Sequence, residues 1–293
     1  MKPFLLSAVL LSSTCEAALA QDTSVFNTSD VQQIGSDHTT TVLQSADFNS
    51  GSLSRVEQIG NDHHVSLGQS AAGSAGNDSI IRQRGSSVYA QVNQSAGDEA
   101  GNSSFIEQDG IENEAFVSQS AMRTSGNNSS ITQIGTNNYT NVLQSNYMWG
   151  NISSVDADGS DNRILVSQNS IEAQNSSQIT IFGDGNRISA EQGAFNMGGN
   201  GSDIEVHGSV NQIDVTQYGV DIPNGSSIFV RGDSNLVGVE QRPTSFSDSA
   251  VSNHSEIDLN GNANSINVLQ NGANANSSVL HTSGNGNSVA VTQ

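Results

Sequence analysis

One motif recurs eleven times along this chain, at intervals of 23 to 29 residues. The first half of each copy has four repeated positions at every second residue: Ser, an apolar residue, a variable inward residue and Gly. Two residues follow, and the second half then has Asn, two more inward residues and a closing Gln, again at every second position. Residues 129–144, SSITQIGTNNYTNVLQ, show the order. A fixed period in this range indicates stacked supersecondary units, none of which can bury its apolar face alone. The repeated glycines are Gly35, Gly60, Gly85, Gly110, Gly135, Gly159, Gly183, Gly208, Gly232, Gly261 and Gly284.

Spacing by two is the side-chain period of a strand. Each copy therefore predicts two strands joined by a tight two-residue turn, with every repeated residue facing inward. Stacking the copies predicts an all-β, cross-β-like fold: a parallel β-solenoid of eleven strand-turn-strand repeats with two facing parallel sheets. The aliphatic position after the leading Ser is occupied by Val31, Val56, Ile81, Ile106, Ile131, Val155, Ile179, Ile204, Ile228, Ile257 and Leu280.

Stacked amide side chains are expected to hydrogen-bond from coil to coil, which satisfies polar groups that are costly to bury. The closing position is Gln44, Gln69, Gln94, Gln119, Gln144, Gln168, Gln192, Gln217, Gln241, Gln270 and Gln293. The first strand carries a second set, Gln33, Gln58, Gln83, Gln108 and Gln133. The position after the turn is Asn113, Asn138, Asn162, Asn186, Asn211, Asn235, Asn264 and Asn287. In this scheme Gln144 faces inward and Asn141 faces solvent.

Two columns change along the chain. The turn position begins with His38, His63 and Val88 before Asn takes over, and the two histidines are expected to hydrogen-bond in place of Asn. After Gln133 the first-strand position becomes Ala157, Ile181, Val206, Val230, Leu259 and Thr282. The chain therefore divides into an amide-rich N-terminal block and a more aliphatic C-terminal block.

This unit resembles the curlin repeat, S-x5-Q-x-G-x2-N-x-A-x3-Q in outline, found in the subunits of curli, the amyloid fibres of bacterial biofilms. The resemblance covers residues 29–293, although the repeat here is slightly longer than the family's usual unit. It implies a subunit of a homopolymeric fibre in the biofilm matrix. It also implies, as partners, a second curlin-like subunit or nucleator and an outer-membrane secretion channel.

Residues 1–20 have the pattern of a secretory signal peptide, with Lys2, an apolar stretch and Ala18-Leu19-Ala20 before Gln21. The apolar stretch is too short to span a bilayer, so no membrane span is expected in the mature chain. Together with the resemblance, this predicts a bacterial protein that is exported through the periplasm to the cell surface or medium. Residues 21–28 form a short N-terminal segment, residues 29–293 form the solenoid, and a longer inter-repeat loop is expected near residues 242–254.

The chain is acidic, with a net charge of −20. Nucleic acid and anionic lipid are therefore not expected partners, because both require clustered cations. Acidic, polar composition is also found in disordered proteins, but the periodic aliphatic columns favour a folded chain.

No cofactor, metal or catalytic residue is predicted. His63 and His64 point to opposite faces of a strand, and Asp156, Asp158 and Asp161 fit a solvated turn better than a calcium loop. Many Asn-x-Ser/Thr triplets, such as the one at Asn102, follow from composition. The outward position directly after the turn Asn, which begins with Thr39, His64 and Tyr89, is too irregular for a flat ice-binding ladder.

The expected function is therefore that of a secreted structural subunit that polymerises into curli-like amyloid fibres for biofilm matrix, adhesion and surface colonisation. The alternative is a soluble monomeric β-solenoid acting as an extracellular binding or adhesin module. Because solenoids normally end in caps and none is visible, both ends are expected to recruit further copies. The C-terminal edge is expected to be the more active, and proline at Val289 and Val291 is expected to remove donors there.

Overall fold

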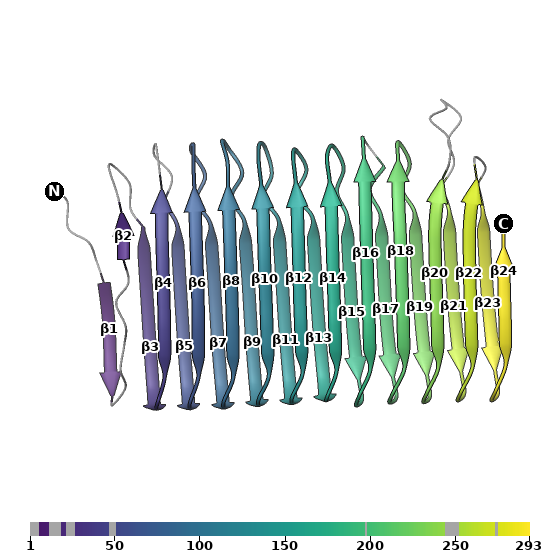
Figure 1. Ribbon diagram of the computed structural model, residues 1–293, viewed down its shortest axis with the longest axis horizontal. Coiled ribbons are helices and arrows are strands. Elements are labelled where there is room, and N and C mark those ends of the chain that lie inside the picture. The colour runs from purple at the N-terminus through teal and green to yellow at the C-terminus, as the bar shows by residue number, and fades with distance from the viewer. Residues whose placement is uncertain are drawn as a thin grey trace.

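The computed structural model describes residues 6–11, 19–21, 27–46, 51–196, 198–243, 252–272 and 275–293. Every regular element in these ranges is a β-strand, and the strands lie across the long axis of the molecule (Figure 1). Odd-numbered strands form one sheet and even-numbered strands form the other, so each repeat makes one coil. The predicted all-β parallel solenoid is confirmed.

The first strand of each repeat belongs to a twelve-stranded sheet that also includes one strand from before the repeats. Its strands are β1 (Leu6–Leu11), β3 (Thr28–Ser36), β5 (Leu53–Asn61), β7 (Asp78–Ser86), β9 (Ser103–Ile111), β11 (Asn128–Thr136), β13 (Ile152–Ser160), β15 (Ser176–Phe182), β17 (Gly201–His207), β19 (Gly225–Arg231), β21 (His254–Asn260) and β23 (Ser277–Ser283).

The second strand of each repeat belongs to the other twelve-stranded sheet. Its strands are β2 (Leu19–Gln21), β4 (Thr39–Ala46), β6 (His64–Ala71), β8 (Tyr89–Ala96), β10 (Glu114–Ala121), β12 (Tyr139–Asn146), β14 (Arg163–Ser170), β16 (Arg187–Phe195), β18 (Gln212–Val220), β20 (Leu236–Pro243), β22 (Ser265–Gly272) and β24 (Ser288–Thr292). All pairs are parallel and join equivalent positions, as where Gln144 lies between Gln119 and Gln168.

Two strands precede the first repeat. Strand β1 pairs in parallel with β3, from Leu6 opposite Ser29 to Leu11 opposite Ile34. Strand β2 is shorter and pairs only with Leu43–Ser45 of β4. Both strands lie within or directly after the predicted signal peptide, whose cleavage stays a prediction.

The irregular connections are only partly described. Pro223 lies in the connection between β18 and β19. Residues 244–251, which hold most of the predicted longer loop, lie outside the described residues, as do 1–5, 12–18, 22–26, 47–50, 197 and 273–274.

The core lies between the two sheets and consists of the repeated residues. In the fifth repeat Ser129, Ile131 and Gln133 of β11 are fully buried, whereas the residues between them are partly exposed. The same alternation holds along β12, where Val142 and Gln144 are buried. Because a slip by one residue would turn these side chains to solvent, the observed register is the one that the sequence predicts.

Side-chain volume is balanced across the core. The five Gln of the first strands end at Gln133, and the second-strand position that faces them holds Thr40, Val65, Ala90, Ala115 and Thr140. Where the first-strand position becomes aliphatic, the facing position holds Ile164, Ile188, Ile213, Val237 and Ile266, all buried. Small residues thus face the long amides, and larger residues face the aliphatic column, which keeps the core close-packed.

The turn between the strands explains the repeated Gly. Gly135 has a φ of +117°, and a Cβ there would lie 2.0 Å from the carbonyl oxygen of Gly159 in the next coil. Asn137, the second turn residue, also has a positive φ, of 55°. The position of Gly135 in each repeat therefore requires Gly for two reasons, its backbone conformation and the close approach of the neighbouring coil.

Candidate functional site: amide ladders and sheet edges

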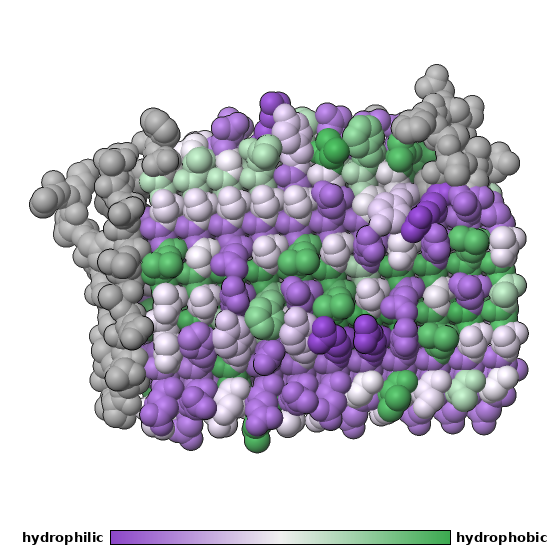
Figure 2. Space-filling view, in the orientation of Figure 1, coloured by the Kyte–Doolittle hydropathy of each residue, from purple (hydrophilic) through white to green (hydrophobic). Residues whose placement is uncertain are grey.

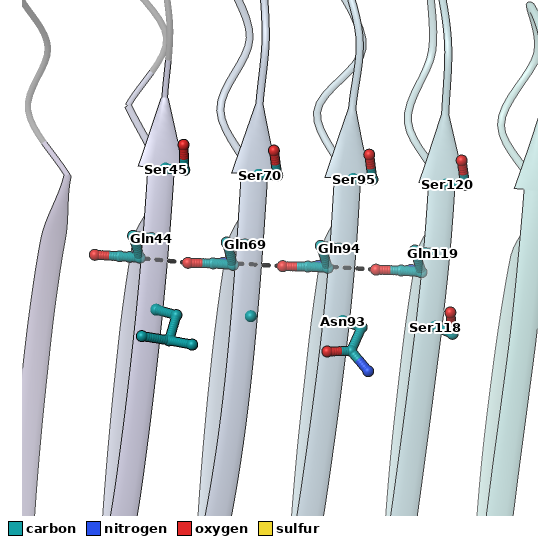
Figure 3. Close-up of a pocket in the computed structure, with 12 residues that line it drawn as sticks. Gln44, Ser45, Gln69, Ser70, Asn93, Gln94, Ser95, Ser118, Gln119 and Ser120 are labelled. Carbon is teal, nitrogen blue, oxygen red and sulfur yellow. Dashed lines mark hydrogen bonds between the residues drawn. The ribbon is translucent and has the colours of Figure 1, made fainter. Parts of the chain in front are cut away.

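The eleven closing glutamines form one continuous ladder, here called the closing-Gln ladder. Each side-chain Nε2 donates to the Oε1 of the next coil, and the ten bonds measure 2.7–3.1 Å. Figure 3 shows four of these glutamines, Gln44, Gln69, Gln94 and Gln119, joined in a row. All the bonds run in the same direction, so the ladder has a donor end and an acceptor end.

The second Nε2 proton of each closing Gln is also used. Gln144 Nε2 donates to the backbone carbonyl of Asn128 at 3.0 Å, across the interior of its own coil. Equivalent bonds join Gln119 to Ser103 and Gln168 to Ile152. Each closing Gln therefore ties the end of the second strand to the start of the first, besides linking neighbouring coils.

The first-strand glutamines form a shorter ladder, from Gln33 to Gln133, with bonds of 2.7–3.1 Å. Threonines lie at both of its ends. Gln33 Nε2 donates to Thr40 Oγ1 at 3.0 Å, and Gln133 Nε2 donates to Thr140 Oγ1 at 2.9 Å. A hydroxyl thus satisfies the terminal amide where the next coil offers only Ala157, and this allows the column to become aliphatic without an unpaired donor.

The turn asparagines form a third ladder. Asn113 Oδ1 accepts both the backbone N–H and the side-chain Nδ2 of Asn138, at 3.0 and 3.2 Å. Asn138 Nδ2 also donates to the carbonyl of Gly159, at 2.7 Å. The side chain therefore fixes the backbone of the next turn as well as its own neighbour.

His38 and His63 take the place of Asn in the first two coils. Their rings stack, with centroids 5.0 Å apart. His38 Nδ1 accepts the backbone N–H of His63, and His63 Nδ1 accepts that of Val88, both at 3.4 Å. This arrangement uses the neutral imidazole, and burial lowers the pKa of His63 from its ordinary value, an effect partly opposed by the Ile59 carbonyl.

A further ladder went unrecognised in the sequence. Two residues before the leading Ser lies a buried column, here called the lead-Asn column, in which Asn127 donates to Asn102 Oδ1 at 3.1 Å and to the Ser120 carbonyl at 2.8 Å. Its members are Asn27, Asn77, Asn102, Asn127, Asn151, Asn175, Asn200, Asn224, Asn253 and Asn276, with Ser52 in the second coil. Side-chain bonds join the members from Asn77 to Asn224, whereas no described residue bonds the buried amide of Asn253.

The lead-Asn column explains most of the Asn-x-Ser triplets. In most of them the Asn is the lead Asn and the Ser is the leading Ser of the repeat, as in Asn102 and Ser104. Both side chains are buried, with exposed fractions of 1% and 2%. The triplets therefore reflect two structural columns, and the signal that could have revealed them was their recurrence at the repeat period.

Among the described residues there is no cluster of three or more His, Cys, Asp or Glu suited to a metal ion. His63 is buried, whereas His64 lies on the outer face and stacks on Tyr89. Burial, assisted by the nearby Asp158, raises the pKa of Asp156.

The outer face that Figure 2 shows carries rows of side chains along the long axis, with apolar residues in separate patches. On the β4–β24 sheet one aromatic row joins His64, Tyr89, Phe116 and Tyr139, with neighbouring centroids 5.0–5.4 Å apart. The guanidinium of Arg163 lies 4.4 Å from the Tyr139 centroid and extends this row.

On the same sheet is a groove of about 610 Å³ over the first four repeats. Its lining includes the closing glutamines of Figure 3 and outward Ser45, Ser70, Ser95 and Ser120. The outward position directly after the turn Asn is irregular in residue type, as predicted. The four serines, at another outward position, form a short regular row.

Charged residues on the other sheet pair between neighbouring strands. Arg82 lies 3.9 Å from Glu57, but Glu107 pairs with Arg84, at 3.8 Å. These contacts are solvent-exposed, so their contribution to stability is small.

The prediction that proline at Val289 and Val291 would remove donors from the open edge is wrong. Gln293 N–H donates to the Leu269 carbonyl and the Gln293 carbonyl accepts from Asn271, so both groups point to β22. Val289 and Val291 share this parity because alternate residues of a parallel strand bond the same neighbour. Proline there would therefore break bonds to β22, and the donors of the outer edge belong to Ser288, Ala290 and Thr292 instead.

At the other end the same backbone polarity has the opposite consequence for the edge. Thr39 N–H donates to the His63 carbonyl in the next coil, at 2.8 Å. Thr40 and Val42, with the opposite parity, therefore direct their N–H groups to the N-terminal edge. Proline at these two positions would therefore remove edge donors.

No protein-family model matches this chain, and no curated protein matches it either. The likeness to the curlin repeat therefore rests on the repeated residues themselves. The described part of the chain has no helix long and apolar enough to cross a membrane.

Proposed function

We propose that this protein is a secreted structural subunit that polymerises into curli-like, amyloid-like fibres at the bacterial surface. In this role it would serve biofilm matrix, adhesion and surface colonisation, with other copies of itself as the principal partner. A second curlin-like subunit or nucleator and an outer-membrane channel complete the expected set of partners.

The observation that carries this proposal is the continuity of the closing-Gln ladder. It passes through all eleven coils in one direction, so every coil offers the next the same closing amide. In-register parallel strands with stacked amides are the architecture of cross-β fibrils. A chain already built in this way needs no change of fold to join another copy.

The test is assembly of residues 21–293, which contain every repeat. We expect unbranched, thioflavin-positive fibres with a diffraction spacing of about 4.7–4.8 Å along the fibre axis. Growth should accelerate with protein concentration and with added fibre fragments. A chain that stays monomeric and β-rich for days at high concentration would refute the proposal.

A structural role also accounts for the buried polar groups better than catalysis does. Most of the buried amides are engaged in ladders along the stack and are not gathered at one place. We therefore propose no enzymatic activity and no cofactor.

A second candidate function is that of a monomeric binding or adhesin module. The outward row from His64 to Tyr139 and the neighbouring serine-lined groove favour it, because aromatic and hydroxyl groups at fixed spacing suit recognition of an extended ligand. This candidate predicts that Tyr89→Ala with Tyr139→Ala weakens surface adhesion of a monomeric protein. The fibre proposal predicts that the same variant still assembles.

A further inference from the structure

We propose that the N-terminal edge, formed by β3 and β4, receives the β23–β24 coil of a second copy in the register of the repeat, and that β1 holds this edge until residues 1–20 are removed. This proposal rests on the proposed function and adds to it the surfaces, the register and the occupant of the joint.

The first argument is the unpaired remainder of the closing-Gln ladder. Ten bonds join eleven glutamines, so one donor and one acceptor are left over. Gln293 Nε2 donates to the Ser277 carbonyl but to no glutamine, and no described residue donates to Gln44 Oε1. A second copy placed head to tail brings Gln293 Nε2 to Gln44 Oε1 and adds the missing bond.

The turn column is complementary in the same way. Inside the chain each turn Asn accepts the backbone N–H of the next turn, as Asn264 does from Asn287 at 2.9 Å. No described residue donates to Asn287 Oδ1. In the joint Asn287 Oδ1 meets the backbone N–H of His38. Within the chain the equivalent N–H, that of His63, donates to the His38 side chain of the preceding coil.

Core side chains also match across the joint. Leu280 meets Val31, and Val291 meets Val42, which continues the aliphatic columns. Thr282 returns a hydroxyl to a column that is aliphatic from Ala157 to Leu259. In the joint this hydroxyl precedes Gln33 in the first-strand column, whereas Thr40 and Thr140 offer their hydroxyls to that column from the facing strand.

Charge favours the same surfaces. The whole chain has a net charge of −20, yet residues 275–293 contain no Asp, Glu, Lys or Arg. The last coil therefore approaches another acidic chain without carboxylate repulsion. The outward pairs of the joint, such as Val279 with Asp30 and Ala290 with Thr41, bring no like charges together.

The structure shows that the receiving edge takes a parallel strand in this register. Strand β1 places Leu6 opposite Ser29 and Leu10 opposite Gln33, which is where β23 of a second copy would lie. Strand β2 covers the facing edge only opposite Leu43–Ser45. Because β1 belongs to the predicted signal peptide, its removal would open the edge at the time of export.

The test uses single cysteines, since residues 21–293 contain none. One chain carries Thr41→Cys and another carries Ala290→Cys, both at outward positions. The joint places these residues side by side on adjacent strands, within the Cα separation that a disulfide allows. Fibres grown from an equal mixture and mildly oxidised should yield a disulfide-linked dimer, whereas either variant alone should not.

The matched control replaces Thr41→Cys by Leu43→Cys, two residues along the same face. Its dimer yield with Ala290→Cys should be at least about ten-fold lower, because the Cα separation exceeds the disulfide range. Equal yields, or a dimer from one variant alone, would overturn the joint. If fibres grow without the expected dimer, the joint is wrong while the fibre function stands; if no fibres grow, the function itself fails.

The role of β1 is tested by retaining residues 1–20 in the Thr41→Cys chain, with Cys15→Ser to remove the native thiol. We expect its dimer yield with Ala290→Cys to fall about ten-fold relative to the processed chain. An unchanged yield would show that β1 does not hold the edge against a second copy.

Discussion

Truncation of one closing glutamine measures what a single rung of the ladder contributes. Gln144 is 2% exposed and makes three side-chain bonds: it accepts from Gln119 at 2.9 Å and donates to Gln168 at 2.8 Å and to Asn128 O at 3.0 Å. Gln144→Ala leaves all three partners without that bond in the dry interior and opens a cavity. At ~1–3 kcal/mol for each unsatisfied group, partly relieved by water entering the cavity, we expect a loss of about 3–5 kcal/mol.

The assay is urea unfolding of monomeric residues 21–293, followed by circular dichroism in the far ultraviolet. With a slope of about 1–3 kcal/mol per molar urea, such a loss should lower the midpoint by roughly 1 M or more. Asn141→Ala, on the outer face of the same strand, should change stability by less than about 0.5 kcal/mol. Assembly should slow for Gln144→Ala and remain near the parent rate for Asn141→Ala.

Gln144→Met separates the hydrogen bonds from the packing, because it keeps most of the side-chain volume and removes the amide. We expect it to recover less than half of the stability that Gln144→Ala loses. If Gln144→Met is as stable as the parent, or if alanine at Asn141 costs as much as at Gln144, the ladder does not stabilise the fold in the way argued here.

Three further changes test other columns. Asn127→Ala should lower stability by about 2–4 kcal/mol in urea unfolding, whereas Asn128→Ala, its exposed neighbour, should change it by less than about 0.5 kcal/mol; similar losses would contradict the lead-Asn column. Gly135→Ala should cost about 2–4 kcal/mol because of its φ and the Gly159 carbonyl, against almost nothing for Gly201→Ala, which meets no atom within 4 Å. Folding lowers the pKa of His63, so its unfolded form binds protons more readily and stability should fall as pH drops below about 6.5. His63→Asn should flatten that part of the pH profile, and an unchanged profile would assign the effect to other groups.

The sequence predicted the fold because the period and the alternation specify the same structure. A repeat of 23 to 29 residues requires stacked coils, and spacing by two decides which side chains are inside. The prediction that His38 and His63 hydrogen-bond in the turn column agrees with their contacts, because imidazole and amide can both accept a backbone N–H. The columns were readable since each coil repeats the same environment.

Two features of the molecule could not be read in this way. The lead-Asn column was hidden because its Asn-x-Ser triplets also occur by composition in an Asn- and Ser-rich chain. The pairing of β1 with β3 joins residues outside the repeat, so no column predicts it. Such a contact depends on an available edge, and the local sequence of Leu6–Leu11 does not specify the strand that it meets.

Edge polarity explains why the proposed joint can form in only one orientation. Alternation tells which face a side chain occupies, but the backbone N–H groups of inward and outward residues point to opposite neighbours along the stack. Outward residues of β24 therefore offer their N–H and C=O groups to the next coil, and inward residues of β4 offer theirs to the previous one. The closing-Gln ladder has the same polarity, with its free donor at Gln293 and its free acceptor at Gln44. Two C-terminal edges brought together would place amide donors against each other, so head-to-tail addition alone continues both the backbone bonds and the side-chain ladder.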